Sequence, residues 1–142
     1  MRNLLLATGA TLALFVSAAV ADEAANKAVG VEGKPLLKAS QTDDGGRLTY
    51  PQGKPEITFL AVTIQPGGRT SLHHHPVVTI VHVLEGEFDV HQGDAVRHYK
   101  VGDTLIEPID SPNQAFNPGS VPTKLLVVHV GEEGKPNSVS EQ

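Results

Sequence analysis

From residue 56 onward, turn residues divide the chain into short β-rich runs, and this pattern restricts the fold more than any other feature. Runs rich in Val, Ile, Thr and Leu recur about every ten residues and alternate with turns such as Pro66-Gly67-Gly68 and Gln92-Gly93-Asp94. β-branched residues favour strands, whereas Gly, Pro and Asp favour turns. The pattern predicts one all-β domain, a sandwich or a barrel. The runs cover residues 56–65, 70–75, 77–86, 87–94, 95–103, 104–109 and 123–134.

Two of these runs, at residues 80–84 and 125–128, are apolar at successive positions instead of alternate ones. Such strands are expected in the interior of the architecture, covered on each side. The chain has no cysteine, so disulfides contribute nothing to its stability. The burial of apolar surface must therefore stabilise the fold. An interface between two copies of the chain would add to the apolar surface that is buried.

The first 21 residues have the features of a secretory signal peptide. Arg2 precedes an apolar run at residues 4–20, and Ala19-Val20-Ala21 supplies the small residues of a cleavage site. The alternative is a membrane anchor, but a spanning helix needs about 20 strongly apolar residues, and Thr, Gly and Ser interrupt this run. We expect cleavage after Ala21 and a mature protein in the periplasm or secreted from the cell.

The remainder of the chain is acidic and divides into an arm, a barrel and a tail. The formal net charge of −5 argues against nucleic acid and, after signal cleavage, against anionic membrane surfaces as partners. The arm is polar and rich in Gly and Pro, which indicates an extended segment with at most short edge strands. The predicted segments are a signal peptide at 1–21, an extended N-terminal arm at 22–55, a β-barrel at 56–134 and a C-terminal tail at 135–142.

Three consecutive histidines, His73, His74 and His75, stand just before Pro76 in the middle of the chain. In an extended segment, neighbouring side chains point to opposite faces and side chains two apart share one. His73 and His75 are therefore a candidate pair of metal ligands, and His74 is expected to point away from them. The alternative is a solvated strand end, because two histidines two apart are a weak signal by themselves.

Around these histidines the sequence resembles the cupin superfamily. In "PGGRTSLHHHPVVTIVHVLEGEFDV", residues 66–90, the Pro-Gly pair, the His-x-His and the Leu-x-Gly turn are similar to the first conserved cupin motif. Residues 102–117 resemble the second motif through Gly102-Asp103, Pro108 and Asn117. The resemblance spans about residues 56–131. It implies a single-domain cupin-type jelly-roll β-barrel of the small exported bacterial kind.

The resemblance also implies a metal site, but the chain departs from the family at two of four ligand positions. In the family, two histidines and a glutamate of the first motif and a histidine of the second hold the ion. Here Thr79 stands at the glutamate position and Asn113 at the second-motif histidine position, while His73 and His75 remain. If half of the ~10–16 kcal/mol of a complete zinc site survives, the dissociation constant lies between about mM and μM. We expect a weakly held divalent transition metal, Mn, Fe, Ni or Zn.

Other polar residues compete for a place in the predicted pocket. Gln114, beside Asn113, is an alternative amide ligand. His82 has the opposite strand parity to Thr79 and should face away, unless a bulge reverses it. His129 shares a face with the apolar residues of its run, so a packed or interface histidine is the simpler interpretation. The predicted ligand-binding residues at the barrel mouth are Ser71, Thr79, Val81, Asn113 and Gln114.

Two function classes are compatible with this sequence. The first is an exported module that binds a small ligand, a divalent metal or both through His73 and His75. The second is a metal-dependent cupin enzyme, an oxygenase, isomerase or decarboxylase, acting on a small oxygen-rich metabolite. Open coordination positions suit metal catalysis, whereas weak metal retention disfavours it. A homodimer is expected, since a jelly roll has exposed sheet edges that a neighbour can cover.

Overall fold

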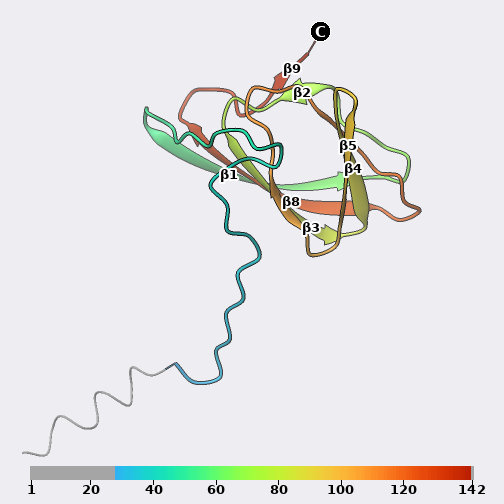
Figure 1. Ribbon diagram of the computed structural model, residues 1–142, viewed down its shortest axis with the longest axis horizontal. Helices are drawn as coiled ribbons and strands as arrows, with labels where there is room; N and C mark the ends of the chain where they lie inside the picture. The colour runs from blue at the N-terminus through green and yellow to red at the C-terminus, as the bar shows by residue number, and fades with distance from the viewer. Residues whose placement is uncertain (1–27, 142) are drawn as a thin grey trace, which may run out of the picture. The chain divides into compact units, whose positions relative to one another are not determined.

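The computed structural model describes residues 28–141, and every regular element in that range is a β-strand (Figure 1). The all-β prediction is therefore confirmed. Pro35–Gln142 forms one compact unit. The predicted signal peptide lies outside the described residues, among which no helix is long and apolar enough to cross a membrane. The strands are β1 (Pro55–Ile64), β2 (His73–His74), β3 (Val78–Glu85), β4 (Glu87–Gln92), β5 (Ala95–Lys100), β6 (Thr104–Ile106), β7 (Gln114–Phe116), β8 (Thr123–Glu132) and β9 (Val139–Ser140).

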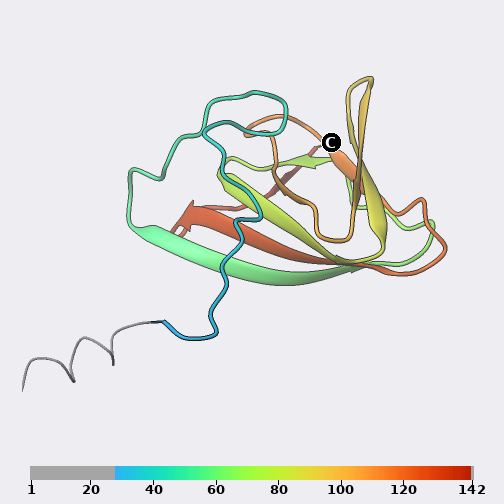
Figure 2. The same cartoon turned by 60° about the horizontal axis from the view of Figure 1, so that its bottom comes forward.

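These strands form three antiparallel sheets. The largest has the order β1-β8-β3-β6, the second has the order β5-β4-β7, and the third pairs β2 with β9. Figures 1 and 2 show the long strands β1 and β8 side by side, with the β4–β5 hairpin standing away from them. Strands distant in sequence are neighbours in every sheet, which is the arrangement expected of a jelly roll.

The core lies between the four-stranded and three-stranded sheets. Along β8, buried Leu125, Val127 and His129 alternate with partly exposed residues, which identifies the inner face of the strand. Phe88 and Val90 of β4 close the core from the opposite sheet. The alternation fixes which side chains can reach the interior. The core cluster consists of Ile64, Val81, Val83, Phe88, Val90, Leu105, Ala115, Leu125 and Val127.

The outer faces of the central strands differ from the sequence-based expectation. Strands β3 and β8 do lie inside the sheet order, but Ile80 and Val128 on their outer face are only half-buried, and Leu84 is exposed. Among the described residues, the segment 37–43 runs beside β6, where Ile106 is buried, but it does not cover the whole of this face. The apolar outer positions are therefore covered incompletely.

The C-terminal tail is more ordered than its polar sequence indicates. Val139 and Ser140 pair with His74 and His73, so residues 135–141 do not form a separate tail in the structure. The Glu141 amide also donates a hydrogen bond to the Leu72 carbonyl. The strand β9 therefore holds the histidine segment on one side, and the bridge between His73 and Asn113 holds it on the other.

One turn near the histidines carries a residue with left-handed backbone geometry. Asp110 has a φ of 53°. Asp adopts this region more readily than most residues do. Its amide donates to the His75 carbonyl at 2.9 Å, so the turn helps to position the histidine segment.

Candidate functional site

A cavity of about 190 Å³ lies between the two main sheets, and both predicted metal ligands, His73 and His75, line it. Its walls are mostly aliphatic. Polar groups of the cavity are histidines, one carboxylate and two hydroxyls. The lining residues are Leu60, Val62, Ile64, Thr70, His73, His75, Val81, Phe88, Glu107, Ala115, Leu125, Val127, His129 and Ser138.

His73 and His75 are both fixed by main-chain carbonyl groups. His73 Nδ1 lies 2.8 Å from the Ser71 carbonyl oxygen, and His75 Nδ1 lies 2.7 Å from that of Asn137. Because a carbonyl oxygen can only accept, each Nδ1 must carry the proton. This leaves Nε2 as the remaining donor atom of each ring, and metal-binding histidines are commonly oriented by the same kind of contact. The two rings lie edge to face, with centroids 4.8 Å apart.

Glu107 supplies a carboxylate at the end of β6 and contacts His75. Its Oε2 lies 2.9 Å from His75 Nε2, and both side chains are buried. Burial, the largest single cause, lowers the pKa of His75, but Glu107 and the Asn137 carbonyl together outweigh it, so the pKa is raised. Within the described chain Oε2 has no well-directed hydrogen bond. The contact is therefore best understood as an ion pair of imperfect geometry.

His129 brings a third imidazole to the cavity from β8. Its ring centroid lies 5.1 Å from that of His75, and its Nδ1 lies 2.9 Å from Thr79 Oγ1. Burial lowers the pKa of His129, and the charge of His75 lowers it further. His129 is therefore neutral near pH 7, which is the form that can bind a metal. Thr79, predicted as a pocket residue, instead lies behind this ring.

Asn113 is almost fully buried beside His73. The two residues exchange main-chain hydrogen bonds of 3.1 and 2.8 Å, so their side chains lie on the same face of the pairing. Both polar atoms of the Asn113 side chain lack a hydrogen-bond partner among residues 28–141. A buried unpaired amide destabilises a fold by about 1–3 kcal/mol, and Asn113, although predicted for the pocket, is not among the residues that line the cavity.

The other predicted residues have different positions. Val81 lines the cavity. Ser71 is exposed and contributes its carbonyl, while Gln114 donates to the Thr70 carbonyl at 2.6 Å and does not line the cavity. His74 points out, with its Nδ1 2.6 Å from Glu141 Oε1. His82 likewise lies on the outer side of β3, where it contacts Thr104 at 2.8 Å.

Sequence reasoning missed Glu107 as a site residue and undervalued His129. A signal was present for both, because Glu107 shares strand parity with buried Leu105, and His129 with Val127. A charged or polar residue at a core position needs a partner. Among residues 28–141, no three His, Asp or Glu side chains already stand in a metal-coordinating arrangement. The 2.9 Å contact of His75 with Glu107 occupies the space that an ion would need.

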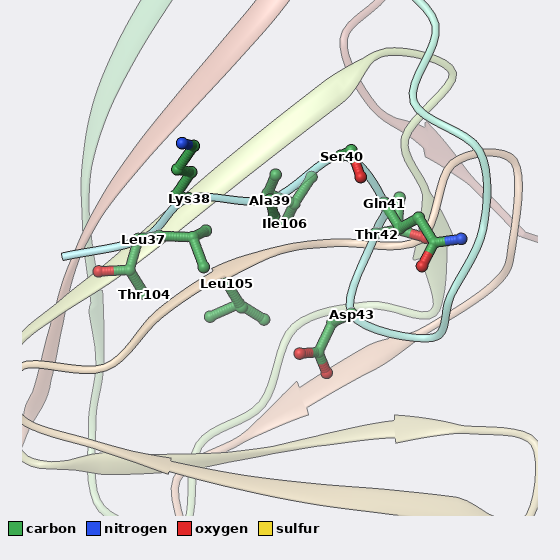
Figure 3. Close-up of a pocket in the computed structure, with 10 residues that line it drawn as sticks. All are labelled: Leu37, Lys38, Ala39, Ser40, Gln41, Thr42, Asp43, Thr104, Leu105 and Ile106. Carbon is green, nitrogen blue, oxygen red and sulfur yellow. The ribbon is translucent and has the colours of Figure 1, made fainter. Parts of the chain in front are cut away.

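A larger hollow of about 390 Å³ lies elsewhere, between residues 37–43 and 104–106 (Figure 3). Figure 3 shows the arm running along β6, with Leu37 near Leu105 and the Asp43 carboxylate at the far end. It contains no imidazole and none of the predicted site residues. Of these two hollows, only the histidine-lined cavity contains residues that the sequence predicts to bind a metal or a ligand.

Comparison with known proteins places this fold in a family. Residues 60–129 match the family model described as "Cupin domain". Among solved structures, the oxalate decarboxylase of Lactobacillus farciminis, in a formate complex, is 27% identical with a TM-score of 0.51. That match covers 59% of this chain and 26% of the decarboxylase, so the chain spans about a quarter of that protein. No curated protein sequence matches the chain.

Two smaller proteins show the same fold. An uncharacterized conserved protein with a double-stranded β-helix domain from Klebsiella pneumoniae is 23% identical, with a TM-score of 0.52 over 67% of this chain and 91% of that one. A cupin-like protein from Thermotoga maritima is 20% identical, with a TM-score of 0.52 over 60% and 64% of the two chains. The chain belongs to the cupin superfamily, and its fold is the all-β jelly roll of that family.

Proposed function

We propose that this chain is an exported cupin protein that binds a divalent transition metal, a small ligand or both in the barrel cavity, through His73 and His75. The observation that carries the proposal is the tautomer of the two rings. Main-chain carbonyl groups of Ser71 and Asn137 hold each Nδ1–H, so Nε2 is the ligand atom of each ring, and that of His75 faces Glu107 at 2.9 Å.

The donor set of the cavity fits such an ion in its chemistry. Glu107 and His129 add a carboxylate and a third imidazole to His73 and His75. Imidazole and carboxylate ligands suit Mn, Fe, Ni and Zn. Glu107 Oε2 is buried without a well-directed hydrogen bond, so it has a lone pair to offer. An ion must, however, displace the proton between His75 and Glu107, and this competition supports weak, pH-dependent binding.

A metal-dependent cupin enzyme is the second candidate, supported by the likeness to an oxalate decarboxylase. A bound divalent ion would polarise a carbonyl or carboxylate oxygen. Glu107 and His75 would hold or release a proton beside that oxygen, because the two groups lie 2.9 Å apart. The aliphatic walls would exclude water from the same region. Metal content of untagged protein, followed by a search for turnover, separates the two candidates.

The test of the proposal uses three adjacent alanine variants. His73→Ala and His75→Ala are expected to weaken binding of Mn, Ni and Zn by about tenfold or more in calorimetric titration, an effect of about 1.4 kcal/mol each. His74→Ala is the matched control, because its ring points out toward Glu141. Equal losses in all three variants would mean that the segment chelates as a flexible tract, and would contradict the cavity site.

Export is a separate part of the proposal. Ala19 and Ala21 supply the small residues of a signal peptidase site, so the mature chain is expected to begin at Asp22. The intact mass of protein recovered from the periplasmic fraction measures this directly. Recovery of a chain that retains residues 1–21 in the membrane fraction would refute export as a soluble protein.

A further inference from the structure

The charge of the cavity restricts what it can accept. Glu107 is its only acidic residue, and none of the lining residues is Lys or Arg. The Glu107 carboxylate lies 2.9 Å from His75 Nε2, so it stands in the path of a second anion that approaches this ring. A carboxylate or phosphate entering this cavity would lose its hydration beside Glu107 without gaining a cationic partner. Anionic ligands are therefore disfavoured.

A bound divalent ion changes this balance only in part. Glu107 as a ligand would cancel one of the two positive charges, which leaves a single net charge. A dianion would still carry an excess negative charge inside aliphatic walls. Arg69, in the segment before the histidines, cannot neutralise the excess charge, because it does not line the cavity.

The size of the cavity and its lining favour a small ligand that is mostly apolar. Eight of the lining residues are apolar, and they come from both main sheets. A buried cavity of about 150 Å³ lined by Leu, Ile and Phe is large enough to bind benzene, and this one measures about 190 Å³. Drug-sized ligands occupy sites of about 300–1,000 Å³, so the occupant must be smaller.

The polar groups are confined to a minor part of the lining. His75 contacts both His73 and Glu107, and His129 stands next to His75. Such a cluster can bind one oxygen atom of a ligand, directly or through an ion. Thr70 and Ser138 are the remaining polar lining residues.

We propose that the cavity takes a small uncharged molecule with a benzene-sized apolar body and a single hydroxyl group, of the class of simple phenols. The apolar body packs against the walls formed by Leu60, Val81 and Val127, and the hydroxyl oxygen points to the histidine cluster. The position of the hydroxyl rests on the proposed function of His73 and His75, whereas the choice of an uncharged apolar body rests on the walls alone.

The experiment uses the mature protein and two small probes, 4-fluorophenol and oxalate. Binding of 4-fluorophenol is followed by ¹⁹F NMR, and binding of oxalate by calorimetry, each with and without one equivalent of Zn. We expect 4-fluorophenol to bind with a dissociation constant of about 1 mM or tighter, and oxalate to bind at least tenfold more weakly in both conditions.

Two variants on adjacent positions of β1 locate the bound probe. Leu60 lines the cavity and is partly exposed at its rim, so Leu60→Trp should fill the space and weaken 4-fluorophenol binding at least tenfold. Phe59 points to the outer face of the same strand. Phe59→Trp is the matched control and should leave the affinity unchanged.

The outcomes separate this inference from the proposed function. If Zn binds through His73 and His75 but 4-fluorophenol does not bind, the ligand class is wrong and the metal site stands. If 4-fluorophenol binds and Zn does not, the ligand class stands without the metal. Tighter binding of oxalate than of 4-fluorophenol, or equal losses in the two Trp variants, would overturn the inference.

Discussion

At the residue scale, the chemistry of the cavity depends on what lies behind each imidazole ring. Ser71 and Asn137 present carbonyl oxygens, and Thr79 presents a hydroxyl. These contacts orient the rings at a fixed angle toward one another, which keeps the rotamer entropy lost on binding small. Glu107 is the one charged side chain that faces them from the cavity lining. It is therefore the residue whose change tests the metal site most directly.

Glu107→Gln is expected to lower the affinity for Zn by about tenfold or more in a calorimetric titration, because the variant removes the anionic ligand and keeps its size. Glu56→Gln is the control, since Glu56 is an exposed carboxylate on β1 and undergoes the same change of charge. Thermal unfolding of both variants establishes that they are folded. An unchanged Zn affinity in Glu107→Gln would exclude the carboxylate as a ligand.

At the element scale, the turn between β3 and β4 joins the two main sheets and sets their approach. Gly86 at this turn has a φ of 72°, and a Cβ atom there would lie 2.9 Å from the Pro122 carbonyl oxygen and 3.0 Å from Thr123 Cα. Both neighbours are main-chain atoms at the start of β8, so they cannot rotate away. The position requires glycine for its conformation and for its lack of a side chain.

Gly86→Ala is expected to destabilise the protein by more than the roughly 1–2 kcal/mol that left-handed backbone geometry costs a non-glycine residue, because the overlap with Pro122 adds to it. Gly93→Ala is the matched control. Gly93 also has a positive φ, of 56°, but a Cβ atom at that position would have no neighbour within 4 Å among the described residues. Urea unfolding of both variants gives the free energies. Equal losses would show that the close approach at Gly86 has no energetic effect.

At the scale of the whole molecule, the outer face of the four-stranded sheet is unusually apolar. Phe59, Val128, Ile80 and Ile106 lie in one row across β1, β8, β3 and β6, and of these Ile106 is buried. Phe59 is 65% exposed, and Ile57, two residues before it, is 53% exposed. β1 also has a free edge, since β8 is its only neighbour among the described strands. Exposed apolar edge strands are sites of association between chains.

We propose that a second copy of the chain covers this face. Glu56 is the only charged residue of β1, so two acidic copies can approach here without strong repulsion. Phe59→Lys is expected to convert a dimer into a monomer, as measured by sedimentation velocity. Val96→Lys is the control, because Val96 is an exposed valine on β5, outside this face. A wild-type chain that sediments as a monomer would contradict the proposal.

The local sequence determined the strands and the side on which His73 and His75 stand. Strand formation and the alternation of side chains depend on neighbouring residues, so β-branched runs, turn glycines and the His-x-His spacing are enough to predict them. The cupin motifs extended this to the jelly roll, which the comparisons confirm. The same parity also separates His74 from its two neighbours, and the structure places that ring against Glu141.

Only the tertiary structure decided which groups surround the two histidines. The carbonyl that holds His75 belongs to Asn137, 62 residues away, and the hydroxyl behind His129 belongs to Thr79, 50 residues away. Glu107 reaches His75 because β6 and β3 pair in a particular register. Such contacts depend on how distant strands align, and a one-residue shift would turn Glu107 to the other face. The sequence contains the candidate ligands, but whether they meet depends on the register of the sheet.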